Sequence, residues 1–311
     1  MWVDRPSWLK TVVLGGFALP HIWLRTGIVT ALSIVTTFLW EEFKTFHYSI
    51  SPVPFTLIGL PLGIFLGFRN NAAYDRFWEG RKLWGGLVNV SRTLTRQILT
   101  LIEAPDADPE ELKRFETSLV RYVIGYFHAV RHHLRDHEPW EVLSHNMLSE
   151  EDIAHLKKQG KTNVPIAMLQ EIGDRIVHAR RKNWIHPFHV PTIEQSLANL
   201  TDLQGGCERI KLTPIPYSYT VLLHRIVAFY CALLPFGIMD AAKWATPLVV
   251  LSVSYCFFGL DAVGDELEQP FGTDVNDLPL HAITRTIERN LRERIGDEIP
   301  QPLQPQKGVL N

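Results

Sequence analysis

Residues 59–71 read GLPLGIFLGFRNN, and this stretch decides the fold of the chain. Small and bulky apolar residues both recur in it with a period of four positions. The small residues are Gly59, Gly63 and Gly67, and the bulky residues one position further on are Leu60, Ile64 and Phe68. One position is about 100° of helix rotation, so the two sets form neighbouring stripes. We predict that the glycine stripe packs closely against protein and that the bulky stripe lies beside this contact.

The bulky stripe has two interpretations. In a ring of subunits it would face the central axis, where apolar side chains can gate ions by dewetting. Ordinary packing of membrane helices explains the same pattern, so the pattern by itself leaves both interpretations open.

The stretch lies within one of four apolar segments that match a membrane span, which needs about 20 mostly apolar residues. We expect spans near residues 21–42, 48–70, 217–239 and 244–264. The short connection before the last span predicts a helical hairpin. The uncharged part of that span, Trp244 to Leu260, has only 17 residues, so a buried helix of a soluble protein would look similar.

The distribution of basic residues predicts the orientation of these spans. The two expected outer loops hold only Lys44 and Lys243, whereas most other basic residues fall on the opposite side. We therefore expect both termini to be cytoplasmic. We see no short apolar core followed by a small-residue cleavage site, so no removable signal peptide is expected.

The remaining residues are compatible with water and with helices. Apolar residues make up 46% of the 311 positions, and the mean hydropathy is +0.01, which indicates a membrane part and a water-exposed part of similar size. We predict helical cytosolic segments at residues 71–215 and 265–298, with helix starts at Asp108-Pro109 and Ser149. Residues 299–311 are rich in Pro and Gln, which predicts a disordered tail. The fold class is therefore an all-α polytopic membrane protein.

Enzyme, metal and nucleic-acid sites find little support. There is no nucleophile, phosphate-loop or dinucleotide motif, and the net charge of −2 does not indicate nucleic acid. The three cysteines are too far apart for a Cys-based zinc site. His128 and His132 lie one turn apart, but Arg131 and Arg135 would repel a cation, so we expect a solvated polar helix face there.

Charged residues near the inner ends of the spans are expensive unless they are paired. We hypothesise that Asp261 pairs with Arg25 or Arg225 at the inner leaflet. Separate extension of each side chain to the interface is an equally good alternative.

Several blocks of the sequence resemble the bacterial branch of the bestrophin family. They occur in family order and cover most of residues 8–290. The blocks are FLGFRNN at 65–71, RKLWG at 81–85, GCERI at 206–210, TPIPY at 213–217, LPF at 234–236 and ELEQPFGTDVNDLPL at 266–280. The resemblance implies a homopentamer around one pore, four membrane helices per subunit, a helical cytosolic part and a location in the bacterial inner membrane.

The same resemblance implies two constrictions of the pore. The family's narrow neck falls on Leu60, Ile64 and Phe68, in agreement with the stripe. A second, cytosolic constriction falls near Ile185 to Phe188, where this sequence departs from the pattern of its relatives.

Eukaryotic relatives bind calcium just after the Pro-Phe-Gly block, which corresponds here to Thr273, Asp274, Asn276 and Asp277. Calcium prefers six to eight oxygen ligands. Two carboxylates provide few of these ligands, so we regard Asp274 and Asp277 as a vestigial calcium clasp and expect no calcium gating. We expect these two residues to cap helices or to pair with arginines.

The expected function is passive conduction of small monovalent ions across lipid, without cofactor or catalytic step. Glu41 and Glu42 on the expected outer side could form an acidic mouth, which leans weakly toward cations such as sodium or potassium. The alternatives are a chloride-conducting channel of the same family, a membrane transporter, and a membrane scaffold protein.

Overall fold

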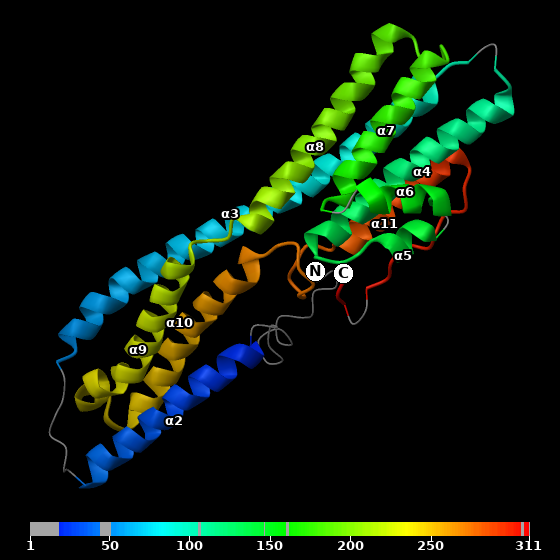
Figure 1. Cartoon of the computed structure of the whole chain (residues 1–311). Coiled ribbons are helices and arrows are strands. Elements are labelled where there is room, and N and C mark those ends of the chain that lie inside the picture. Colours follow the sequence, from blue (N-terminus) through cyan, green and yellow to red (C-terminus); the bar gives the residue numbers. More distant parts are fainter. Residues whose placement is uncertain are drawn as a thin grey trace. The chain divides into compact units, whose positions relative to one another are not determined.

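The computed structural model describes residues 19–43, 51–104, 107–145, 147–159, 162–305 and 308–310. Within these ranges the regular structure is helical, which confirms the predicted all-α class (Figure 1). An isolated bridge between Ile102 and Ile185 pairs backbone outside the helices. The helices are α2 (Leu19–Phe43), α3 (Val53–Leu101), α4 (Pro109–Leu134), α5 (Trp140–Ser144), α6 (Glu150–Gln159), α7 (Val164–Arg181), α8 (Val190–Leu212), α9 (Tyr217–Ala242), α10 (Thr246–Glu268) and α11 (Leu280–Ile295), with short 3₁₀ turns η1 (Pro187–His189) and η2 (Lys243–Ala245).

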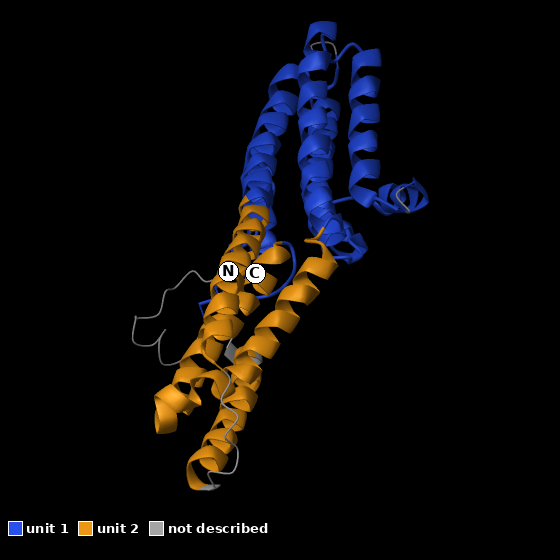
Figure 2. Cartoon of the chain, turned by 90° about the vertical axis from the view of Figure 1, so that its left-hand side faces the viewer, with its two compact units in different colours: residues 1–3, 79–213, 271–311 blue, residues 4–78, 214–270 orange. Residues whose placement is uncertain are grey.

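The chain divides into two compact units (Figure 2). Unit 1 comprises residues 1–3, 79–213 and 271–311, and unit 2 comprises residues 4–78 and 214–270. Helix α3 contributes its first part to unit 2 and its remainder to unit 1.

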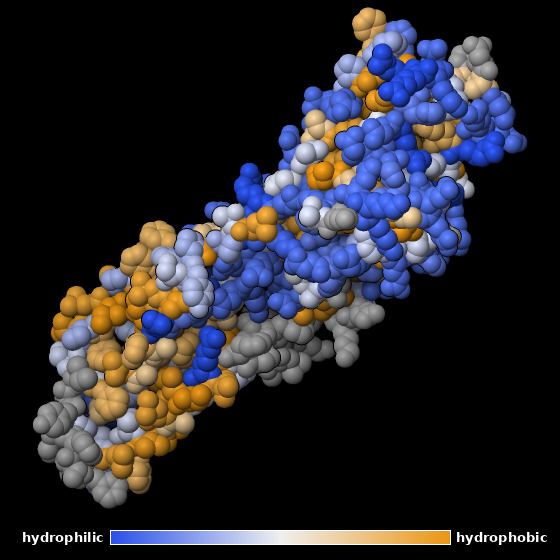
Figure 3. All heavy atoms as spheres, viewed as in Figure 1, coloured by the Kyte–Doolittle hydropathy of each residue, from blue (hydrophilic) through white to orange (hydrophobic). Residues whose placement is uncertain are grey.

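Unit 2 contains the apolar helices α2, α9 and α10 and the first part of α3. Figure 3 shows hydrophobic side chains gathered over these elements. Three stretches are long and apolar enough to cross a membrane: Ile22–Glu42, Val53–Leu101 and Tyr217–Glu268. The last stretch contains both α9 and α10, because η2 joins them in a tight reversal where Lys243 has a φ of 47°. The expected hairpin is therefore present, whereas four crossings of a membrane stay a prediction.

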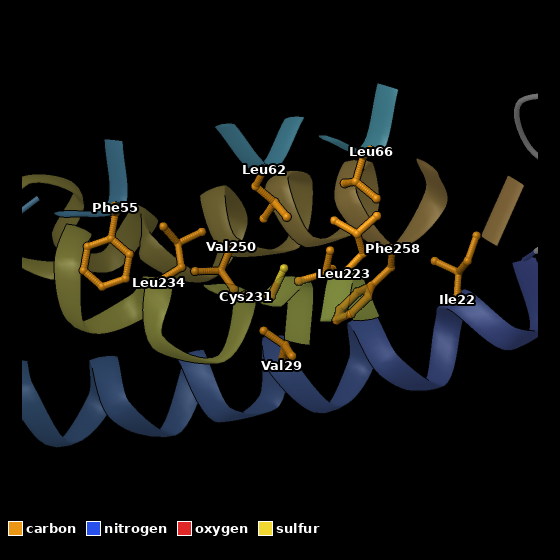
Figure 4. Packing of buried hydrophobic residues seen from close by; sticks show 11 residues of the cluster. Ile22, Val29, Phe55, Leu62, Leu66, Leu223, Cys231, Leu234, Val250 and Phe258 are labelled. Atoms are coloured by element: carbon orange, nitrogen blue, oxygen red, sulfur yellow. The ribbon is translucent and has the colours of Figure 1, made fainter. Parts of the chain in front are cut away.

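The core of unit 2 is formed where α2, α3, α9 and α10 meet. Figure 4 shows Leu62 and Leu66 of α3 pointing toward Leu223 of α9 and Phe258 of α10, with Val29 contributed by α2. Leu66 and Val227 are fully buried in this cluster. Apolar burial alone does not hold helices together in lipid, so close packing of this kind carries much of the association.

Unit 1 is built from the second part of α3 together with α4 to α8 and α11. The predicted helix starts are confirmed: the Asp108 carboxylate accepts a hydrogen bond from the Glu110 amide, and the Ser149 hydroxyl accepts one from the Asp152 amide. Helices α3 and α8 approach closely, because a Cβ on Gly206 would lie 2.8 Å from Leu83 Cδ2. Residues 299–305, the first part of the expected tail, carry no helix, and the disorder of the tail stays a prediction.

Candidate functional site

One face of α3 is buried against its own unit. Along the part of the helix that belongs to unit 2, the buried residues recur at intervals of three, four and seven positions, which is one helical stripe. They are Phe55, Leu62, Leu66, Arg69 and Ala73. This stripe determines the orientation of the helix around its own axis.

The predicted neck residues lie on the opposite face of the same helix. Leu60 is 71% exposed, Ile64 50% and Phe68 62%. Each is two positions, or about 200° of helix rotation, from Leu62 or Leu66. These three bulky apolar side chains, spaced one helical turn apart, therefore point away from the core of their own chain. They are free to line a surface outside that chain.

The glycine stripe behaves differently from the prediction. Only Gly59 packs closely within the chain, since a Cβ there would lie 2.7 Å from the hydroxyl of Tyr230. Gly63 and Gly67 have nothing within 4 Å of an added Cβ. The expected close packing is thus confirmed at Gly59 and is wrong, within a single chain, at the other two positions. The reason is that α3 turns the buried stripe with Leu62 and Leu66, which we call the leucine stripe, toward α9 and α10. The rest of the glycine stripe does not face these helices.

A buried arginine follows directly after Phe68. Arg69 is 1% exposed, and its Nη1 donates to Asp261 Oδ1 at 2.8 Å and to the Asp261 carbonyl at 3.3 Å. Its Nη2 donates to Asp265 and lies 3.8 Å from Glu268 Oε2. Both carboxylates and Glu268 belong to α10, so one guanidinium joins α3 to the last turns of α10.

Further polar groups surround the same carboxylates. His224 Nδ1 lies 2.7 Å from Asp261 Oδ2, and Arg25 Nη1 lies 3.6 Å from the same oxygen. The adjacent Asn70 donates to the carbonyl of Leu260 at 3.0 Å. The end of α10 is therefore tied to α2, α3 and α9 at one place.

The pairing hypothesis for Asp261 was right about Arg25 and missed the main partner. Arg225 is exposed and forms no ion pair with Asp261 among the described residues, whereas Arg69 is the nearest arginine, at 2.8 Å. A signal for Arg69 was present in the sequence, because it continues the spacing of Leu62 and Leu66. Its burial, however, depends on where α10 lies.

The cluster also offers the one group of three potential metal ligands that the described residues bring together. Single atoms of His224, Asp261 and Asp265 lie within 4.8 Å of one another. Arg69 already donates to both carboxylates, and Arg25 adds a second positive charge nearby. Two guanidinium groups oppose a cation at this place, so we assign the group to ion pairing.

The histidine run on α4 is not the solvated face that we expected. His128 is only 2% exposed and Arg131 only 7%. The expectation was wrong because α11 packs against α4 and covers these residues. Within the described part of the chain, the run gathers no set of three metal ligands.

The residues of the predicted cytosolic constriction lie in very different environments. Ile185 is 2% exposed and its backbone pairs with Ile102. Phe188, in η1, is 83% exposed. The burial of Ile185 does not fit a side chain that lines a pore, whereas Phe188 has the exposure that such a role requires.

The predicted outer mouth lies at the end of α2. Glu41 is half-buried and Glu42 is exposed in the last turn of this helix. Residues 44–50, which complete the expected outer loop, lie outside the described residues.

The vestigial calcium clasp forms a tight turn. The Asp274 amide donates to Asp277 Oδ2 at 2.7 Å, and the Asp277 amide donates to the Asp274 carbonyl at 3.1 Å. Burial raises the pKa of Asp277 to about 6. This carboxylate accepts a backbone hydrogen bond within the turn and is costly to ionise. It therefore stabilises a turn and not a helix start, because the N-cap of α11 is Pro279, without a side-chain hydrogen bond.

Comparisons with known proteins indicate the same family over nearly the whole chain. The family model described as "Bacterial/Fungal Bestrophin protein" matches residues 1–293. A protein of Ralstonia nicotianae named as a voltage-dependent anion channel-forming protein is 36% identical over 302 residues, covering 95% of each chain. A protein of Escherichia coli with the same designation is 34% identical over 310 residues, covering 98% of each. A crystal structure of a bacterial bestrophin homologue from Klebsiella pneumoniae is 34% identical and matches with a TM-score of 0.80 over 89% of this chain and 99% of that chain.

The Arg69 cluster makes a prediction about stability. Replacing Arg69 with glutamine leaves Asp261 buried without its closest counter-charge, and removing one partner of a buried pair costs about 3–5 kcal/mol. We expect the Arg69→Gln protein to lose its folded assembly at a clearly lower temperature in detergent, as measured by fluorescence and size-exclusion chromatography.

Arg25→Gln is the matched control, because the Arg25 side chain is 51% exposed and 3.6 Å from Asp261. An exposed pair contributes about 0–1 kcal/mol. Equal melting temperatures for the two variants would show that the buried pair does not stabilise the protein.

Proposed function

This chain belongs to the bacterial and fungal bestrophin family, as its motifs predicted, and from that premise we propose that five copies form a channel through which small ions pass passively. The proposal extends to this chain the channel-forming activity for which its relatives in Ralstonia nicotianae and Escherichia coli are named. The five-fold assembly rests on the family resemblance.

The observation that carries the proposal is the exposed stripe of α3. Leu60, Ile64 and Phe68 lie on a helix with the composition of a membrane span, yet they point away from the core of their own chain. In a ring of subunits, this face supplies three successive apolar rings to the axis. Narrow apolar rings expel water and so oppose the passage of hydrated ions, which is the behaviour of a gate.

We place the apolar helices α2, α9 and α10 and the first part of α3 in the inner membrane and unit 1 in the cytoplasm. Four crossings per subunit put both termini on the cytoplasmic side, in agreement with the basic residues around them. Phe188 is our candidate for the cytosolic constriction, because its side chain is exposed whereas that of Ile185 is buried.

Acidic residues favour cations as the permeant ions. Asp75 is exposed and follows Phe68 by seven positions, so it falls about 20° from the same stripe. Five such carboxylates below the neck, with Glu41 and Glu42 at the outer end, would attract sodium or potassium. Anion conduction is the second candidate, and the names of the curated relatives favour it.

We propose that calcium does not gate this channel. Asp277 is buried and its carboxylate is engaged in a turn, which leaves Asp274 as the exposed carboxylate of the former clasp. The current should be unchanged by micromolar calcium on the cytosolic face. Activation by calcium there would contradict the assignment.

A first prediction concerns the neck. Replacing Leu60, Ile64 and Phe68 together with alanine widens three apolar rings and weakens dewetting, so we expect a several-fold larger single-channel open probability or current in planar bilayers. Phe229→Ala on α9 is the size-matched control, because Phe229 is 68% exposed on a different apolar helix. Unchanged conduction in the triple variant would mean that the stripe is not the neck.

A second prediction concerns ion selectivity. Under a salt gradient across a planar bilayer, the reversal potential should lie near the cation equilibrium potential, and Asp75→Asn should move it toward zero. A reversal near the anion equilibrium potential would establish the second candidate. Saturable flux with competition between substrates would instead favour a transporter, and no flux from purified protein in liposomes would favour a scaffold.

A further inference from the structure

A cavity of about 570 Å³ lies within unit 1, beside the contact between α4 and α11. Its inner end is formed by long basic side chains and one carboxylate: His128, Arg131, Arg285, Glu288 and Arg292. The rim includes Val142, Met147 and Pro300, together with the exposed Glu141 and Glu298. None of these residues belongs to the proposed ion pathway.

The single inner carboxylate is already fully engaged. Glu288 Oε1 accepts a hydrogen bond from Arg292 Nε at 2.9 Å. Glu288 Oε2 lies 3.3 Å from His128 Nε2 and 3.6 Å from Arg285 Nη1. Burial alone would raise the pKa of Glu288, but the His128 hydrogen bond and the neighbouring arginines lower it to about 2. Glu288 therefore stays ionised, and within the described structure it neither accepts a hydrogen bond from Arg131 nor lies within ion-pair distance of it.

Arg131 is the unsatisfied member of the cluster. It is 7% exposed, and its Nη2 donates to His132 Nε2 at 2.7 Å, which is a neutral acceptor. Its Nη1 is buried without a hydrogen-bond partner among the described residues. Burial, followed by the charges of Arg135 and Arg285, lowers the pKa of Arg131 to about 10. A buried guanidinium donor without an acceptor is costly, and it is rare in native proteins unless water or an ion satisfies it.

Arg285, on α11, also has a buried donor without an acceptor among the described residues. Its Nε is likewise buried without a partner in the described structure, and its nearest carboxylate oxygen is the shared Glu288 Oε2. Two guanidinium groups from different helices thus line one cavity with donors that the chain does not satisfy. His128 and His281 add no charge at neutral pH, since burial lowers the pKa of both side chains, that of His281 to about 4.

We propose that this cavity binds the phosphate group of a small cytosolic phosphate monoester, held by Arg131 and Arg285. Guanidinium groups present planar pairs of donors that match the oxygens of a phosphate. Arg131 and Arg285 each have a buried nitrogen without an acceptor in the described structure, and Arg131 has no carboxylate within ion-pair distance there. The acidic rim at Glu141 and Glu298 repels large polyanions, and the apolar rim residues suit an uncharged organic part. The volume falls in the range of small-ligand sites.

Calorimetric titration of the full-length protein in detergent, at constant ionic strength and neutral pH, tests the proposal. The probes are inorganic phosphate and glycerol 3-phosphate, with sodium chloride, sodium acetate and glycerol as controls. We expect saturable binding of glycerol 3-phosphate, and weaker binding of inorganic phosphate because it lacks the organic part. Tighter binding of inorganic phosphate would overturn the monoester and identify free phosphate as the ligand.

Variants at the two arginines locate the site. Arg131→Gln and Arg285→Gln should each weaken binding by about tenfold or more, which corresponds to the loss of one charge-assisted hydrogen bond. Arg285 is the safer variant if Arg131→Gln fails to fold, because its side chain is 26% exposed. Arg180→Gln, an exposed arginine near the end of α7 in the same unit, is the matched control and should bind as the native protein does.

Three results would overturn the proposal. The first is the absence of saturable phosphate binding above the chloride control. The second is native affinity in folded Arg285→Gln or Arg131→Gln protein. The third is acetate binding as tightly as either phosphate probe, because a site for any carboxylate would not need two guanidinium forks.

Discussion

The ion pair between Arg69 and Asp261 is the interaction on which the arrangement of unit 2 depends. It is fully buried, and it joins the middle of α3 to the end of α10. Charges inside an apolar environment are stable only when they are paired with good geometry. Any rotation of α3 that moves Arg69 away from α10 would separate a buried guanidinium from its carboxylates at Asp261, Asp265 and Glu268. The pair therefore acts as a strong restraint on the rotational position of this helix.

That restraint has a direct consequence for the residue next to it. Phe68 precedes Arg69 and lies on the other side of the helix from the buried leucine stripe, so the pairing of Arg69 keeps Phe68 pointing outward. Ile64 and Leu60 follow at one-turn intervals. A charged contact within the chain thereby orients the apolar face that we propose as the neck. The ion pair and the proposed neck are coupled because Arg69 and Phe68 are adjacent in the sequence.

Unit 1 has a different problem, a buried arginine without a carboxylate partner among the described residues. Glu288 serves His128, Arg285 and Arg292 together, which leaves Arg131 without a carboxylate. The same physical rule that explains the Arg69 cluster, that buried charge needs compensation, makes this second cluster incomplete. Arg69 has three carboxylates of α10 within 4 Å, whereas Arg131 has none among the described residues. This difference in counter-charge separates the two arginine clusters.

Much of the architecture could be predicted from local sequence. The apolar runs, the caps at Asp108 and Ser149 and the stripe at Leu60, Ile64 and Phe68 depend on residues a few positions apart, and the structure contains all of them. The partners of Arg69 could not be predicted in the same way, since Asp261 lies 192 positions further along the chain. The exposure of Phe188 and the burial of Ile185 likewise depend on which surfaces other elements cover.

Residues 59–71 show which features local sequence predicts and which depend on tertiary contacts. The sequence by itself determined that residues 59–71 form a helix with a small stripe beside a bulky one, because helical periodicity is local. It could not determine which stripe packs inward, since both are compatible with a close contact. The tertiary contacts make this choice: the leucine stripe and Arg69 meet α9 and α10, whereas a Cβ added at Gly63 or Gly67 would have no neighbour within 4 Å among the described residues. The physical reason is that the core and a buried charge pair select the face, and both are made by residues far away in the sequence.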